Sequence, residues 1–403
     1  MAPLDSTPTR TMSPALVGLF ATGSAVSVAN VYYAQPLLDL MAADYGIAAA
    51  AVGGVVTATQ AGSALALLLL VPLGDRVDRR RLILVQVILL CLALLAVTAT
   101  SGALALTIVM LAVGLLGTAM TQGLIAYAAS AAGPGERGSV VGAAQGGVVI
   151  GLLLARVLAS AIADVAGWRW VYGISSVAMA VLGILLWRRL PVQSLAPKPM
   201  SYGALIRSML TLLRTERVLQ VRGTLALLMF AAFGIFWSTL VLPLAATPFG
   251  MSHTAIGAFG LVGVAGALAA GRAGRLADRG LGQRTTGAAL LLLVLCWLPL
   301  GVGMRPGLAG MAVLALGILA LDIAVQALQV TNQGMIFAAR PGAASRMVGC
   351  YMMFYAAGSG LGALAGTAAY AAGGWHAACL LGAAISLAAL LFWHLTRGWM
   401  QRA

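Results

Sequence analysis

Charged residues are scarce in this sequence. Only 8% of its 403 residues are charged, whereas 61% are hydrophobic. Ordinary soluble domains carry about 25% charged residues. The mean hydropathy is +1.00, and a soluble protein of this size has too little interior to hide so much apolar surface. The composition therefore predicts an integral membrane protein.

The motifs of common enzyme classes are also absent. The single lysine, Lys198, does not stand in the Gly-Lys-Ser/Thr ending of an ATP-binding loop. The sequence contains no zinc-hydrolase motif and no Gly-x-Ser-x-Gly elbow. We therefore expect no enzyme and no cofactor. Any active transport would draw on an ion gradient, with protons as the first candidate, or on a partner ATPase.

The cysteines do not have the spacing of a metal site. Each lies alone in a separate apolar run, whereas zinc sites and redox pairs place cysteines close together. Buried thiols that act as small apolar groups explain this pattern, so we expect no bound metal. The four residues are Cys91, Cys296, Cys350 and Cys379.

Twelve apolar runs reach the length of about 20 residues that a helix needs to cross a bilayer. They predict an all-α fold of twelve transmembrane helices, arranged as two six-helix halves, residues 1–190 and 221–403. Residues 191–220 form a linker in which residues 202–218 are predicted to be an amphipathic helix, with a disordered linker as the alternative. The predicted spans are residues 14–40, 50–73, 81–101, 103–130, 138–163, 168–189, 223–246, 255–277, 285–304, 307–333, 345–371 and 374–396.

The two halves share landmarks at a constant offset of 207 residues. Equal numbers of spans in the same orientation are typical of parallel-repeat transporters, so we predict pseudo-symmetric halves. The matching landmarks are Pro36 with Pro243, Gly142 with Gly349, Gly151 with Gly358, and Gly167-Trp168 with Gly374-Trp375.

Basic residues gather at both termini and in every second loop, apart from Arg156, Arg169 and Arg305. This positive-inside pattern predicts a multi-pass protein with both termini and the linker in the cytoplasm. The net charge of +14 then reflects orientation and attraction to anionic lipid. The expected partners are the lipid bilayer and a small-molecule substrate, without nucleic acid, and the expected state is a monomer.

Two charged residues lie deep within predicted spans. An ionised side chain there costs at least about 2.5 kcal/mol, so it needs a partner, a water-filled cavity or a proton. Arg156 lies about 27 Å and Asp322 about 24 Å from the predicted cytoplasmic ends of their helices, so the two could pair across the halves. We predict that Asp322 is a proton or cation site and that Arg156 neutralises it or holds an anionic substrate group. A static ion pair is the alternative.

Polar side chains also recur at helical spacing. Because lipid disfavours such stripes, they are predicted to face a cavity or a neighbouring helix, with interhelical hydrogen bonding as the alternative. The residues concerned include Asn30 and Tyr33 in the first span, Gln122 in the fourth, and Asp322, Gln326, Gln329 and Gln333 in the tenth.

The charged loop after the second span carries the most specific motif. It resembles the cytoplasmic loop signature of the major facilitator superfamily, Gly-x-x-x-Asp-Arg-x-Gly-Arg-Arg/Lys, and a partial second copy follows 203 residues later. The matching residues are Asp75, Arg76, Arg79 and Arg80 in the first copy and Gly274, Asp278 and Arg279 in the second.

Within that superfamily the sequence is most similar to the bacterial efflux branch of drug and sugar proton antiporters, through residues 32–36 and Leu321-Asp322. It lacks the fourth-span arginine and the fifth-span Gly-Pro signature of that branch. The resemblance implies a bacterial inner-membrane protein that works by alternating access, with spans one, four, seven and ten around a central cavity. The implied lining residues are Asn30, Tyr33, Gln122, Trp237, Asp322 and Gln326.

These observations predict a secondary active transporter that exports a small organic solute against proton entry. Uptake by symport and facilitated diffusion are the alternatives within transport. A membrane sensor or binding scaffold that moves no solute is the alternative in another class.

The resemblance also implies that the two charged loops form a cytoplasmic gate against helix N-termini of the opposite half. A carboxylate at such a terminus contributes about 0.3–1 kcal/mol. Asp75→Asn should therefore weaken the state in which the cytoplasmic side is shut, and cysteine probes on that side should be labelled faster. Unaltered labelling would contradict the gate.

Overall fold

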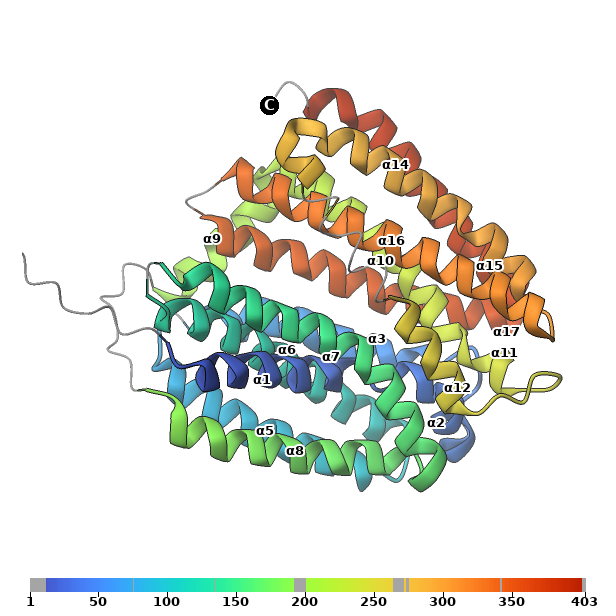
Figure 1. The fold of residues 1–403 in the computed structure, drawn as a ribbon, viewed down its shortest axis with the longest axis horizontal. Coiled ribbons are helices and arrows are strands. Elements are labelled where there is room, and N and C mark those ends of the chain that lie inside the picture. Colours follow the sequence, from blue (N-terminus) through green and yellow to red (C-terminus); the bar gives the residue numbers. More distant parts are fainter. Residues whose placement is uncertain are drawn as a thin grey trace, which may run out of the picture.

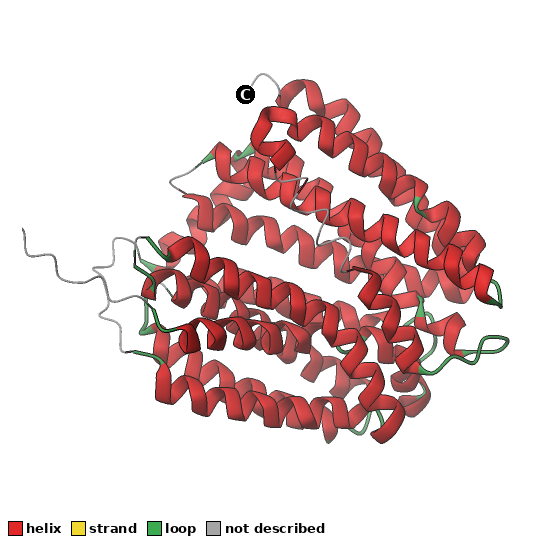
Figure 2. Cartoon of the chain, viewed as in Figure 1, coloured by secondary structure: helices red, strands yellow, loops and turns green. Residues whose placement is uncertain are grey.

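The computed structural model describes residues 12–74, 76–133, 135–191, 201–263, 272, 275–340 and 343–400. This part consists of helices and loops without strands (Figure 2). It contains 10 helices long and apolar enough to cross a membrane. One of them, Arg346–Gly398, has 53 residues and is broken at Gly373 and Gly374, so it holds two spans. With the short apolar helix His253–Val262, whose residues from 255 onward fall in the predicted eighth span, these helices match the predicted all-α membrane fold, which is confirmed.

The first two spans of the N-terminal half are interrupted helices. In the first, Pro36 follows α1 closely, and proline ends regular helical hydrogen bonding because it lacks an N–H group. The elements of this half are α1 (Pro14–Tyr32), η1 (Gln35–Leu37), α2 (Leu38–Tyr45), α3 (Gly53–Leu65), η2 (Ala66–Leu70), α4 (Val71–Leu73), α5 (Arg79–Thr98), α6 (Ala103–Ala131), α7 (Arg137–Ala166) and α8 (Trp168–Arg189).

The first helix of the C-terminal half begins earlier than the predicted seventh span. It starts at Arg217, six residues before that span, and therefore includes Arg222, which the predicted span left out. The elements of this half are α10 (Arg217–Thr239), α11 (Val241–Ala245), α12 (His253–Ala258), η3 (Phe259–Val262), η4 (Ala277–Leu281), α14 (Gly282–Leu295), α15 (Trp297–Gly303), α16 (Leu308–Ala339) and α17 (Ala344–Met400).

Helix α9 (Tyr202–Thr215) lies in the linker and contacts both halves. The Tyr202 hydroxyl donates to the Leu69 carbonyl oxygen at 2.7 Å, and Arg346 donates to the Ser208 hydroxyl at 2.9 Å. The linker helix therefore ties the ends of the second and eleventh spans together.

The helices of the two halves converge at the end that carries α2, α11 and α12 and diverge toward the end that carries α9 (Figure 1). Hydrogen bonds agree with this arrangement. Thr57 donates to the Gly360 carbonyl oxygen at 2.7 Å, and the Gly53 N–H donates to Thr367 at 3.2 Å. Across the described ranges, all hydrogen bonds from residues 12–189 to residues 217–400 lie at the α12 end. The structure is therefore closed at that end.

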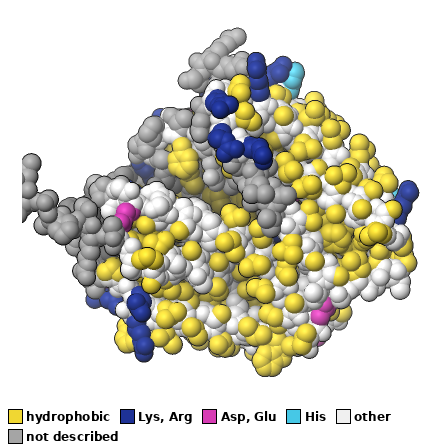
Figure 3. Space-filling view, in the orientation of Figure 1, with side chains coloured by type: hydrophobic (Ala, Val, Ile, Leu, Met, Phe, Trp, Pro, Cys, Tyr) yellow, Lys and Arg dark blue, Asp and Glu magenta, His cyan; other side chains and the backbone are white. Residues whose placement is uncertain are grey.

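The outer surface is apolar, as a lipid-facing surface must be. Large side chains such as Leu104, Trp170 and Leu380 are 76%, 61% and 72% exposed. On the face drawn in Figure 3, apolar groups cover broad areas, and most of the visible basic side chains lie in its left half and along its upper edge.

Helices α3 and α6 pack so closely that only glycine fits between them. A Cβ atom at Gly114 would lie 1.8 Å from the Thr59 carbonyl oxygen, and one at Gly62 would lie 2.0 Å from the Leu111 carbonyl oxygen. Contacts of this kind let two membrane helices gain van der Waals packing along their whole length.

Gly114→Ala should therefore destabilise the protein by about 1–3 kcal/mol, because the added methyl group meets backbone atoms that cannot move aside. Thermal unfolding of the detergent-purified protein measures this as a lower melting temperature. Gly18→Ala is the matched control, because a Cβ atom added at Gly18, in α1, would have no other atom within 4 Å. Equal melting temperatures for the two variants would refute the close-packing argument.

Candidate functional site

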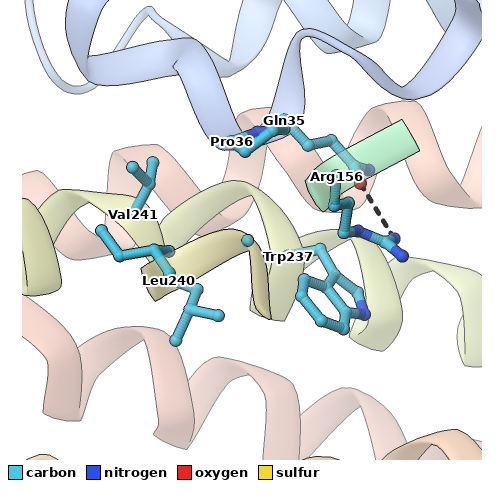
Figure 4. A pocket seen from close by; sticks show the side chains of 8 residues that line it. Gln35, Pro36, Arg156, Trp237, Leu240 and Val241 are labelled. Atoms are coloured by element: carbon cyan, nitrogen blue, oxygen red, sulfur yellow. Dashed lines mark hydrogen bonds between the residues drawn. The ribbon is translucent and has the colours of Figure 1, made fainter. Parts of the chain in front are cut away.

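Arg156 is held at the contact between the two halves. It lies in α7 and is 2% exposed. Its Nη2 donates to the Gln35 Oε1 at 3.1 Å, and its guanidinium carbon lies 3.9 Å from the ring centroid of Trp237 (Figure 4). Gln35 belongs to the N-terminal half and Trp237 to α10 of the C-terminal half. A cation over an aromatic face is stabilised by about 2 kcal/mol or more when it is desolvated.

A pocket adjoins this arginine. Its enclosed free space is about 10 Å³, room for about one water molecule, so a larger occupant requires the walls to move apart. The polar part of its wall is formed by Gln35, Arg156 and Trp237 (Figure 4). The remaining lining residues are Pro36, Leu240, Val241, Ile256 and Gly257.

Three glycines at the start of the eighth span bring the two deep charges near each other. A Cβ atom at Gly260 would lie 3.4 Å from the side chain of Arg156, and one at Gly263 would lie 3.0 Å from the Asp322 Oδ2. At Gly257 a Cβ atom would lie 2.8 Å from the Arg156 carbonyl oxygen. These glycines follow each other at a spacing of three residues, so one face of α12 and η3 packs against both charged residues.

Asp322 is a neighbour of Arg156 rather than its direct partner. It lies in α16 and is 7% exposed. Both residues lie in the described part of the chain, and their charged atoms do not come within the 4.0 Å that defines an ion pair. Their charges nevertheless interact, while Asp322 Oδ2 has no hydrogen-bond partner. The charge of Asp322 is thus free to respond to a proton or a ligand.

The other predicted cavity residues fall into two groups. Three make their contacts within one half. Asn30 accepts from Ser175 at 2.7 Å, Tyr33 packs edge-on against Tyr172, and Gln329 accepts from Tyr351 at 2.6 Å. The second group, Gln122 and Gln326, is partly exposed. The structure therefore gathers Arg156, Asp322 and Trp237 into one site and places Asn30, Tyr33 and Gln329 in helix packing beside it.

The predicted gate lies partly outside the described residues. Asp75 and Gly274 are not described, nor is the side chain of Asp278, whose backbone lies in η4. The basic residues of the two copies are described. Arg79 donates to the Gly74 carbonyl oxygen at 3.0 Å, and Arg80 donates to the Trp187 carbonyl oxygen at 2.6 Å. Arg76 is partly buried, and Arg279 is exposed.

Two polar features were missed by the sequence analysis. Gln35 stood among the polar residues of the first span without an assigned partner, yet it bonds Arg156. Arg222 is fully buried and donates to Thr286 at 2.9 Å and to Asn332 at 3.2 Å. A predicted seventh span that began at Arg217, as α10 does, would have included Arg222 as a third charge inside a span.

A second polar cluster closes the α12 end. The His253 imidazole lies between two carboxylates of the other half, with Nε2 at 2.8 Å from Asp39 and Nδ1 at 3.1 Å from Asp164. The Thr254 backbone N–H also donates to Asp164, at 2.7 Å. Hydrogen bonding to Asp39, and further to Asp164, raises the pKa of His253 above its usual range, although burial opposes this. We name these four residues the α12-end clamp.

Comparisons with known proteins agree with this architecture. Residues 20–333 match the sequence profile of the Major Facilitator Superfamily. The uncharacterized transporter YgaY of Escherichia coli O157:H7 is 42% identical over 386 residues, which cover 96% of each chain. Among solved structures, the nucleoside transporter NupG has a TM-score of 0.77 at 13% identity, covering 94% of this chain and 98% of its own. A bacterial homologue of the lysosomal transporter Spinster has a TM-score of 0.76 at 12% identity, covering 97% and 98%.

The clamp should weaken as pH rises. A group whose pKa is raised in the closed state stabilises that state below its ordinary pKa of about 6.5 and loses this effect as pH rises through the raised value. Spin labels on cysteines at Ala48 and Ala246, in a background without the native cysteines, should separate between pH 6 and pH 9. His253→Gln should remove this pH dependence. A distance in the unsubstituted protein that does not change with pH would refute the clamp.

Proposed function

This chain belongs to the Major Facilitator Superfamily, and we propose that it exports a small organic solute across the bacterial inner membrane in exchange for protons. It is a membrane transporter and not an enzyme. Our proposal concerns the finer points: export, proton coupling, the inner membrane, cytoplasmic termini and a monomeric state.

The observation that carries the proposal is a buried charged site shared by two halves. Arg156 comes from the N-terminal half, whereas Trp237 and Asp322 come from the C-terminal half. When the halves rock to open the α12 end and close the other end, the surroundings of both charges must change. A site whose electrostatics change with the direction it faces has the property that coupled alternating access needs.

Asp322 is the group that we assign to proton coupling. A lone buried carboxylate is stabilised either by a positive charge or by a proton. Arg156 lies close enough to interact with it, but too far to form a direct pair. In the export cycle, a solute that binds at Asp322 would compete with the proton for this carboxylate, so one leaves as the other enters.

Symport is a second candidate, favoured by the hydrogen-bond donors around Arg156. Arg156 Nε, Gln35 Nε2 and Trp237 Nε1 are buried without partners. If the solute supplied acceptors to these donors, a proton on Asp322 would remove a competing negative charge. The solute and the proton would then bind together, which is the condition for symport.

Asp322→Asn should abolish solute-driven proton movement while solute exchange persists, because asparagine has similar size but cannot titrate. Purified protein in vesicles with an internal pH dye, exposed to a panel of organic solutes, reports both. The direction of the pH change distinguishes antiport from symport.

Asp44→Asn serves as the control for this experiment. Asp44 forms an ion pair with Arg169 within the N-terminal half, away from the pocket, so its replacement should leave coupling intact. Unchanged coupling in Asp322→Asn would overturn the assignment of Asp322. Ligand binding without any flux would favour the sensor alternative.

A further inference from the structure

The pocket beside Arg156 presents more hydrogen-bond donors than the described residues satisfy. Arg156 Nε, Gln35 Nε2 and Trp237 Nε1 each lack a partner. The three side chains are 2%, 1% and 4% exposed and line the same pocket (Figure 4). An unsatisfied buried donor costs about 1–3 kcal/mol, so a ligand that brings acceptor oxygens gains directly from binding here.

The charge of the site points the same way. The Arg156 guanidinium has an amide oxygen and an aromatic ring as its neighbours, and among the described residues no carboxylate lies within 4.0 Å of it. A planar oxyanion would match its fork of N–H groups. Among the described residues that line the pocket, Arg156 is the one cation, so a second negative charge on the ligand would lack a partner.

The rest of the pocket wall is apolar. Pro36, Leu240, Val241 and Ile256 contribute hydrocarbon surface opposite the polar residues. Such a wall favours an apolar ligand body through burial of its surface. A ligand with an apolar body would bury its own surface against this wall, which a small polar ion cannot do.

We propose that this pocket binds the carboxylate of a small organic monoanion with an apolar body, and that such a monoanion is the solute that the protein moves. The carboxylate lies against Arg156 and accepts from Trp237 and Gln35, while the hydrocarbon part lies on the Leu240–Val241 and Ile256 side. This inference rests on the proposed function in that it takes the Arg156 pocket as the transport site, and a monoanion that binds there together with a proton on Asp322 would select the symport candidate.

Binding to the purified full-length protein tests the charge class directly. Benzoate, benzamide, benzylammonium and phthalate share a ring but carry a carboxylate, a neutral amide, a cation and a dianion. Hexanoate and hexanamide repeat the first comparison with an aliphatic body. Benzoate or hexanoate should raise the melting temperature increasingly with ligand concentration, because a ligand stabilises the folded state by RT ln(1 + [L]/Kd), and the amides, the cation and the dianion should not. Tighter binding of any of these others, or no binding by either monoanion, would overturn the proposal.

Point variants locate the binding. Trp237→Phe keeps a ring beside Arg156 but removes the indole N–H, so it should weaken monoanion binding about 10- to 100-fold, as expected for one hydrogen bond to a charged group. Arg156→Lys should weaken it at least as much, because lysine lacks the planar fork. Trp393→Phe is the control, since the Trp393 N–H bonds Gln283, outside this pocket. Equal affinities in all three variants would overturn the proposal even if all of them fold.

Flux measurements separate this inference from the proposed function. If the protein in vesicles binds benzoate through Arg156 but moves no solute, transport is refuted, whereas the monoanion as the class of bound ligand stands. Proton-coupled flux of a neutral or cationic solute, insensitive to Arg156→Lys, would refute the monoanion and leave transport intact.

Discussion

The burial of the Arg156 guanidinium is the constraint on which the centre of this structure depends. Removing a cation from water costs several kcal/mol even after relaxation. Here the cost is offset by groups from both halves: Gln35 from the first span, the face of Trp237 from the seventh, and the more distant charge of Asp322 from the tenth. The cation is therefore stabilised by an interface, and any movement of that interface changes its free energy.

The glycines of the eighth span explain how the interface can be this close. Gly257 and Gly260 allow α12 and η3 to lie against the backbone and side chain of Arg156, and Gly263 lets the same segment reach Asp322. The α12-end clamp sits at the start of that segment, at His253 and Thr254. One short element thus joins the closed end of the molecule to its central charges. Opening the clamp would move the glycine face that packs against Arg156 and Asp322, which gives a physical route between gating and the state of the site.

The sequence predicted those parts of the structure for which any other arrangement would cost the most free energy. The membrane fold followed from apolar runs, and Arg156 and Asp322 stood out because charge within a span is costly. Whether a polar side chain faces a cavity or a neighbouring helix was harder to predict. Asn30 bonds Ser175 instead of lying alone on a cavity wall, because a single amide fits helix packing and cavity lining equally well. The roles of Gln35 and of Gly257, Gly260 and Gly263 could not be predicted, since glycine occurs 50 times in this chain and their importance depends on which helix lies opposite.

The charge of the solute decides which coupling this site supports. A cation would compete with the proton for Asp322, so loading one would release the other, as in exchange. An anion would compete with Asp322 for Arg156, so it would bind best when Asp322 carries a proton, and the two would travel together. The unpartnered groups that line the pocket are three donors, whereas the unpartnered Asp322 Oδ2 lies outside that lining. The geometry around Arg156 therefore favours co-binding, and the resemblance to exporters favours exchange. Because one carboxylate and one guanidinium serve both schemes, the chemistry of the solute, and not a different set of residues, distinguishes them.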